Sequence, residues 1–149
     1  MKKITAIISA LVLSIMCLSG CGGSEIDMTE AANSLLTGVT FAEELQPTSE
    51  NISLRRLGLN EADVESCIAY ASTNAVVDEF AIVKATNPEG VESSIRSHID
   101  SQIQTYQSYA PDEVAKLNNA IVQVSGDYVI YVVSSDNTAA QSVVDSIVK

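Results

Sequence analysis

Few side chains in this sequence could form a covalent or acid–base site, and the first candidates are a thiol and an imidazole. Cys67 lies in the apolar stretch SCIAYA, and His98 is the one histidine of the chain. A cysteine nucleophile needs a base beside it and a third group to orient that base. The sequence places no such group near His98, so we interpret Cys67 as a small, buried hydrophobic residue. A Cys67–His98 catalytic pair is the minor alternative.

Adjacent carboxylates are the next candidates for chemistry. They occur at Glu43-Glu44 and at Asp78-Glu79. Neighbours in sequence usually point apart, so neither doublet predicts an acid–base pair by itself. Metal sites need several ligands close together, and the carboxylates are otherwise scattered. The sequence therefore predicts no catalytic residue, no metal site and no cofactor.

A different thiol chemistry is indicated near the N-terminus, at Cys21. Lys2 and Lys3 precede a short apolar run over residues 4–18. As a helix this run spans roughly 22 Å, less than the roughly 30 Å of a hydrocarbon core, so it is typical of a secretory signal. The run ends in a four-residue motif: Leu18, Ser19, Gly20 and Cys21.

This motif resembles the lipobox of bacterial lipoproteins. Small residues let the segment enter a peptidase, and the thiol of Cys21 takes a diacylglyceryl group, so that two acyl chains hold the protein firmly. We expect a signal peptide over 1–20, a lipidated N-terminus and tether over 21–26, and one domain over 27–149. The alternatives are an ordinary signal with a chance cysteine and an uncleaved anchor.

Composition limits the classes of partner. The chain has 149 residues, of which 46% are apolar, and a net charge of −11. This is enough for one domain with a sizeable core. A nucleic-acid partner is excluded because the chain has no basic face to neutralise phosphates. An anionic membrane surface would repel the folded part as well.

The pattern along the chain predicts an α+β fold. A helix begins at Asp27 and ends at Gly38, and a loop-like stretch with Pro47 follows. Later elements are strands over 64–73 and 78–85, a long helix capped by Asn87 with Pro88 in its first turn, a short helix after Pro111, a hairpin over 120–134 and a C-terminal helix capped by Asp136 or Asn137. The long helix carries an apolar stripe spaced mostly by four residues: Val91, Ile95, Ile99, Ile103 and Tyr106. We expect two layers: a four-stranded, largely antiparallel sheet with helices on one face, in the order β-β-α-β-β-α after the N-terminal helix.

One stretch does not fit a sheet covered on one face only. Residues 128–133, YVIYVV, are apolar on both faces. Either the N-terminal helix or a partner must cover the second face. We favour the N-terminal helix.

The order of these features resembles a known family. The order starts with a lipobox, an acidic helix and a turn at Leu57-Gly58-Leu59. Two strands and a long helix follow, and the segment Tyr109–Leu117 then leads into the hairpin at Gly126-Asp127-Tyr128. This order is similar to the small lipoproteins of Gram-positive bacteria in domain-of-unknown-function family 4358, over roughly residues 27–148. The resemblance implies an exported domain tethered to a membrane. It implies no activity.

Binding is the function that the remaining residues favour. Tyr106 and Tyr109 lie three residues apart near the end of the long helix, and Arg55 and Arg56 form a positive pair on an acidic chain. The preferred alternative is that Tyr106 packs on the core and that the arginines neutralise carboxylates.

We therefore expect an extracytoplasmic, lipid-anchored protein of a bacterium, with a non-enzymatic domain that binds an envelope protein or a cell-wall component. A surface hydrolase or ligand-capturing enzyme, and an accessory subunit of an exported complex, are the alternatives.

Overall fold

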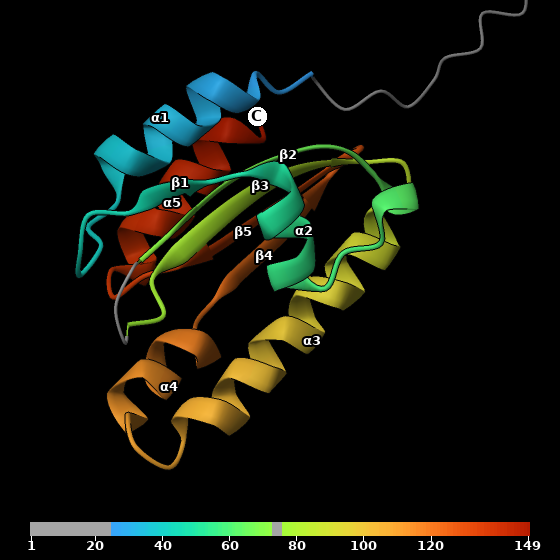
Figure 1. Cartoon of the computed structure of the whole chain (residues 1–149). Coiled ribbons are helices and arrows are strands. Elements are labelled where there is room, and N and C mark those ends of the chain that lie inside the picture. The colour runs from blue at the N-terminus through green and yellow to red at the C-terminus, as the bar shows by residue number, and fades with distance from the viewer. Residues whose placement is uncertain (1–24, 73–75) are drawn as a thin grey trace, which may run out of the picture.

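Residues 25–72 and 76–149 are described by the computed structural model shown in Figure 1. They form one five-stranded antiparallel sheet between two layers of helices. The lipidation motif at 18–21 lies outside the described residues. The predicted α+β class and the antiparallel pairing are confirmed, whereas the predicted strand count and layering are wrong.

The sheet has the order β1-β2-β3-β5-β4. Its strands are β1 (Gln46–Thr48), β2 (Val64–Ala71), β3 (Glu79–Ala85), β4 (Ile121–Ser125) and β5 (Tyr128–Val133). The four-strand prediction omitted β1, which pairs with β2 at the edge of the sheet. Pro47 made this segment look like a loop, but an edge strand tolerates a proline because one side of it has no partner strand.

The predicted hairpin between β4 and β5 is confirmed. Ser125 pairs with Tyr128, which leaves Gly126 and Asp127 as a two-residue turn. Gly126 has a φ of 56°, a left-handed conformation that glycine adopts without steric cost. The hairpin places β5 in the middle of the sheet, where all six of its residues are buried.

One face of the sheet is covered by α2 (Glu50–Leu57), α3 (Pro88–Tyr106) and α4 (Pro111–Asn118). Asn87 caps α3 by accepting a hydrogen bond from the Gly90 amide, and Pro88 occupies the first turn, as predicted. The predicted apolar stripe of α3 packs on this face of the sheet; its members are Val91, Ile95, Ile99, Ile103 and Tyr106.

The second face is covered by α1 (Met28–Gly38) and α5 (Asn137–Ile147), which pack against each other. The prediction of helices on one face is therefore wrong. Helices cover the second face as well because the central strands are apolar there. Phe80 and Ile82 of β3 and Ile130 and Val132 of β5 are at most 1% exposed there. The expected cover by the N-terminal helix is confirmed, and α5 joins it.

Within 25–72 and 76–149, we find no helix with the length and hydropathy needed to cross a bilayer. Large hydrophobic side chains that remain exposed in this part of the chain are Ile52 and Tyr109. Neither lies on a face of the sheet.

Candidate functional site

Two consecutive carboxylates are buried where β3 begins. Asp78 is 0% exposed and Glu79 is 3% exposed. An ionised carboxylate in such a place requires compensating donors, because burial removes its water shell. The two side chains point to different partners, as expected for neighbours along an extended chain.

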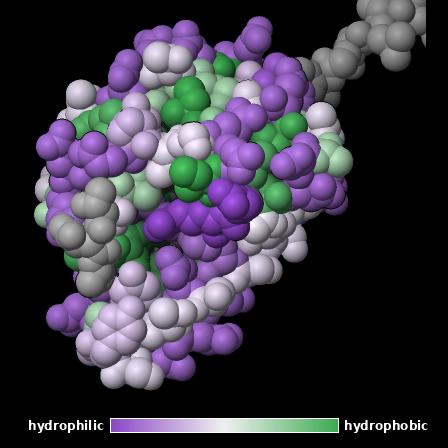
Figure 2. Space-filling view, in the orientation of Figure 1, coloured by the Kyte–Doolittle hydropathy of each residue, from purple (hydrophilic) through white to green (hydrophobic). Residues whose placement is uncertain are grey.

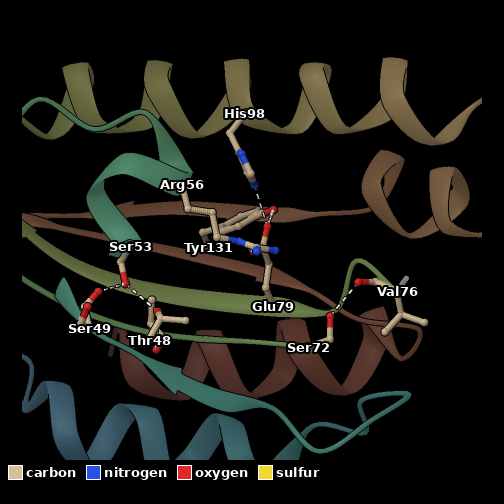
Figure 3. A network of polar contacts seen from close by, with 10 residues as sticks. Thr48, Ser49, Ser53, Arg56, Ser72, Val76, Glu79, His98 and Tyr131 are labelled. Carbon is tan, nitrogen blue, oxygen red and sulfur yellow. Dashed lines mark hydrogen bonds and ion pairs between the residues drawn. The ribbon is translucent and has the colours of Figure 1, made fainter. Parts of the chain in front are cut away.

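Glu79 receives donors from three elements of the fold (Figure 3). One carboxylate oxygen, Oε1, lies 2.8 Å from Nε2 of His98 on α3 and 2.9 Å from the hydroxyl of Tyr131 on β5. The other oxygen, Oε2, accepts a 2.8 Å bond from Nε of Arg56 on α2. The three donors converge on one carboxylate and join α2 and α3 to the sheet.

Electrostatics keep Glu79 ionised. Burial alone would raise its pKa, but the hydrogen bond from His98 and the positive charge of Arg56 outweigh burial, so the pKa lies below its ordinary value of 4.5. An ionised carboxylate only accepts hydrogen bonds, so His98 donates through Nε2. Burial, together with the negative charge of Glu79, raises the pKa of the Tyr131 hydroxyl well above 10, which keeps that donor protonated.

Asp78 organises the neighbouring end of the same face. Its Oδ1 accepts a 2.8 Å bond from Nζ of Lys116 on α4, and its Oδ2 accepts from the amide of Ala42 at 2.5 Å. Lys116 also pairs with Glu113 at 3.1 Å. Burial would lower the pKa of Lys116, but its bonds to Asp78 and Glu113 raise it overall. Two carboxylates share the one ammonium group of this cluster, which attaches α4 to the sheet.

A polar groove lies between α2 and α3, beside the Glu79 cluster. Its volume is about 460 Å³, and its lining includes Arg55 and Arg56 from α2 and a row of side chains from α3. The α3 residues are Ser93, Ser94, Ser97, His98 and Ser101. In Figure 2 the most hydrophilic surface of this face lies over α2, and a paler band runs along α3. No acidic side chain occurs among the described residues that line the groove.

Local structure explains how α2 presents its arginines. The buried hydroxyl of Ser53 contacts Thr48 of β1 at 2.7 Å and donates to the carbonyl of Ser49, which holds the start of α2 on the sheet. Gly58 ends the helix with a φ of 65°, a left-handed cap. Arg55 and Arg56 occupy the last turn, where the helix dipole favours positive charge.

The structure separates the predicted binding residues into two places. Arg55 and Arg56 line the groove, while Tyr106 and Tyr109 lie at the α3–α4 corner with ring centroids 5.2 Å apart. Tyr106 packs partly on the core, as the preferred alternative stated, and Tyr109 is 63% exposed. Arg56 neutralises a carboxylate, which also agrees with that alternative, but Arg55 does not.

Cys67 and His98 make no hydrogen bond to each other within the described residues; His98 binds Glu79 instead. Cys67 is 8% exposed, and burial, followed by the charge of Glu50, raises the pKa of its thiol to about 12. The interpretation of Cys67 as a packed hydrophobic residue is confirmed. The described part of the chain also contains no group of three or more histidine, cysteine or carboxylate side chains placed to hold a metal.

Sequence reasoning did not anticipate the Glu79 cluster, because its members come from four separate elements. A weak signal was present: Glu79 continues directly into the apolar strand FAIV, where a carboxylate must be buried or at an end. His98 lies beside the apolar stripe of α3, which is where a partly buried donor would be found.

Comparison with family models gives a match over the sheet and the α2–α3–α4 layer. The model of the family described as Domain of unknown function (DUF4358) matches residues 40–134. The chain belongs to this family. The DUF4358 match contains the whole Glu79 cluster and the α2–α3 groove, and it leaves out α1 and α5. Comparisons with curated proteins and with solved structures gave no match.

The first prediction concerns the charge of Glu79. Glu79→Gln removes the charged acceptor from three donors and should lower the free energy of unfolding at pH 7 by about 2 kcal/mol. Because the folded pKa is depressed, the stabilisation is present above the unfolded value near 4.5 and is lost as pH falls through the folded pKa. Urea unfolding of both proteins at several pH values measures this.

Glu92→Gln is the control, because Glu92 pairs with the exposed Arg96 and should contribute about 0.5 kcal/mol or less. An equal loss of stability for Glu79→Gln at pH 7 and at pH 3 would contradict the role assigned to the charge.

The second prediction concerns Cys67. With a pKa of about 12, its thiol is almost fully protonated at pH 7.5, so alkylation by iodoacetamide should be at least roughly 100-fold slower in the native protein than in urea. Peptide mass spectrometry measures modification at this residue. Rapid native alkylation that His98→Ala slows would restore the cysteine–histidine alternative.

Proposed function

We propose that this DUF4358 protein is a lipid-anchored, extracytoplasmic domain of a Gram-positive bacterium that binds an envelope protein or a cell-wall component without catalysis. The α2–α3 groove is its binding site. The observation that carries this proposal is a positively charged groove on a chain of net charge −11. The groove combines two arginines with serine hydroxyls, and no acidic side chain occurs among its described lining residues. One of the arginines, Arg55, has no ion-pair partner in the described chain. Charge that is not neutralised internally is available to a ligand.

The anchor in this proposal is Cys21. Lys2 and Lys3, the short apolar run and the Leu18–Cys21 motif support export and acylation. Gly22, Gly23 and Ser24 would act as the tether. The chain then enters α1, which belongs to the helical layer on the opposite face of the sheet from the groove (Figure 1). This placement leaves the groove free of the layer to which the tether leads.

Binding is favoured over hydrolysis by how the polar groups are used. His98 directs Nε2 at Glu79, and the hydroxyl of Ser97 donates to the carbonyl of Ser93. No serine among the described residues hydrogen-bonds His98. A nucleophile needs a base within hydrogen-bond reach, so this arrangement positions side chains without activating them.

A surface hydrolase is the second candidate, because an imidazole paired with a depressed-pKa carboxylate lies beside four serines. Ester hydrolysis abolished by His98→Gln in a folded variant would favour it. The third reading, an accessory subunit docked through an open sheet face, has no support in the described residues, since helices cover both faces.

The third prediction tests the anchor. Cys21→Ala removes the thiol that would accept the diacylglyceryl group, so the variant should remain an unprocessed precursor and incorporate no labelled palmitate in cells. Cys17→Ala, which changes a thiol outside the motif, should be labelled like the wild type. Normal palmitate labelling of Cys21→Ala would remove the basis for the anchor.

The fourth prediction tests the groove. A photo-cross-linking amino acid at Ser97 should capture an envelope component in intact cells, because Ser97 is an exposed lining residue. The same group at Asn33, exposed on α1 in the other layer, is the matched control. Adding Arg55→Gln to the Ser97 variant should reduce capture. Equal capture from both positions would place the binding surface elsewhere.

A further inference from the structure

We propose that the α2–α3 groove is an oxyanion site, which binds a phosphate or carboxylate group carried on a larger polar ligand. This inference rests on the proposed function, because it names the ligand chemistry of the same groove. Its donors are the guanidinium groups of Arg55 and Arg56 and the hydroxyls of Ser93, Ser94 and Ser101 on α3.

Arg56 is held in place by its inner nitrogen. Nε donates to the buried Oε2 of Glu79 at 2.8 Å, while the terminal nitrogens make no hydrogen bond to any residue that the structure describes. The Arg56 side chain is 36% exposed and lines the groove. A guanidinium oriented before the ligand arrives loses less conformational entropy on binding, and its planar fork matches the geometry of carboxylates and phosphates.

Arg55 supplies charge that nothing in the described chain neutralises. Lys84, Arg96 and Lys116 pair with Glu65, Glu92 and Asp78, and Arg56 pairs with Glu79. Among the described residues, Arg55 and the C-terminal Lys149 are the basic side chains that form no such pair, and of these two only Arg55 lines the groove. Arg55 lines the groove, so its charge is directed to a site that has no acidic lining residue.

The opposite wall of the groove comes from α3. Ser93, Ser97 and Ser101 follow at intervals of four, one turn apart, and Ser94 and His98 lie next to them. The Ser97 hydroxyl donates to the Ser93 carbonyl, so the hydroxyls of the other three serines complete the coordination of an anion that the guanidinium groups hold from the other side. The volume of about 460 Å³ greatly exceeds the roughly 30 Å³ share of one water, so there is room for the body of a ligand beyond its charged group.

The charge of the whole chain restricts the source of the oxyanion. A protein of net charge −11 is repelled by a dense anionic surface, whereas a screened, short-range contact with a single group is not disfavoured to the same degree. The oxyanion is therefore carried by a soluble or wall-borne ligand and not by the headgroups of the membrane.

The test uses the full chain in nanodiscs of phosphatidylcholine. Inorganic phosphate and acetate are titrated separately, at constant ionic strength, and backbone amide signals of α2 and α3 are followed by NMR. At least one of the two anions should shift the signals of residues 55–58 and 93–101. Arg55→Gln should weaken that binding by about tenfold, the equivalent of one charge-assisted hydrogen bond.

Two matched variants separate charge from geometry. Arg96→Gln removes a positive charge from α3 that is already paired with Glu92 and does not line the groove, so it should bind like the wild type. Arg55→Lys keeps the charge without the planar fork and should have an intermediate affinity. Thermal melting confirms that each variant folds, which we expect because Arg55 is exposed.

The inference is overturned if neither anion shifts these signals, or if Arg55→Gln binds as tightly as the wild type. Capture of an envelope partner at Ser97 with no anion binding would reject the oxyanion and leave the proposed function standing. Anion binding without capture of an envelope partner at Ser97 would reject the proposed function and leave the oxyanion site standing. Phosphatidylglycerol nanodiscs that shift the signals of residues 55–58 and 93–101 with no added anion, in the wild type but not in Arg55→Gln, would show that headgroups occupy the groove, which contradicts the proposed source.

Discussion

The burial of a single carboxylate, Glu79, is the constraint on which one whole face of this protein depends. A charge that is 3% exposed is tolerated only when donors replace the water it has lost. Here those donors come from α2, α3 and β5, so the position of each element is coupled to the same two oxygen atoms. Such a network is stable when all its members are satisfied and costly when one is missing.

The preceding residue extends this organisation. Asp78 receives Lys116 from α4 and the amide of Ala42 from the segment after α1. Two neighbouring carboxylates thus attach α2, α3 and α4, the three helices of one layer, to the sheet. The difference between them is functional in our proposal. In the Asp78 cluster, the ammonium group of Lys116 pairs with two carboxylates of the protein itself. In the Glu79 cluster, only one nitrogen of Arg56 is bonded to Glu79, and the rest of the guanidinium group lies beside the groove.

The helices on the two faces of the sheet are held by different kinds of interaction. The α2–α3–α4 face combines an apolar cluster with buried ion pairs. The α1–α5 face is closed by hydrophobic packing, including Leu35 and Val144, which are both 0% exposed. Apolar packing is non-directional and tolerates many arrangements, while a charged network specifies one. The DUF4358 match covers the directional face completely and stops short of both helices on the other.

The sequence by itself determined the elements that local chemistry specifies. Asn87-Pro88 marked the start of α3, its four-residue spacing identified the buried stripe, and Gly126-Asp127 identified the hairpin, because caps, helical periodicity and turn conformation depend on nearby residues. The apolar residues 128–133 also indicated that the second face needs a cover, but only the tertiary structure decided that α5 joins α1 there and that β1 extends the sheet. It alone joined Glu79 to Arg56, His98 and Tyr131, since those contacts connect segments 19 to 52 residues apart and no local pattern records them.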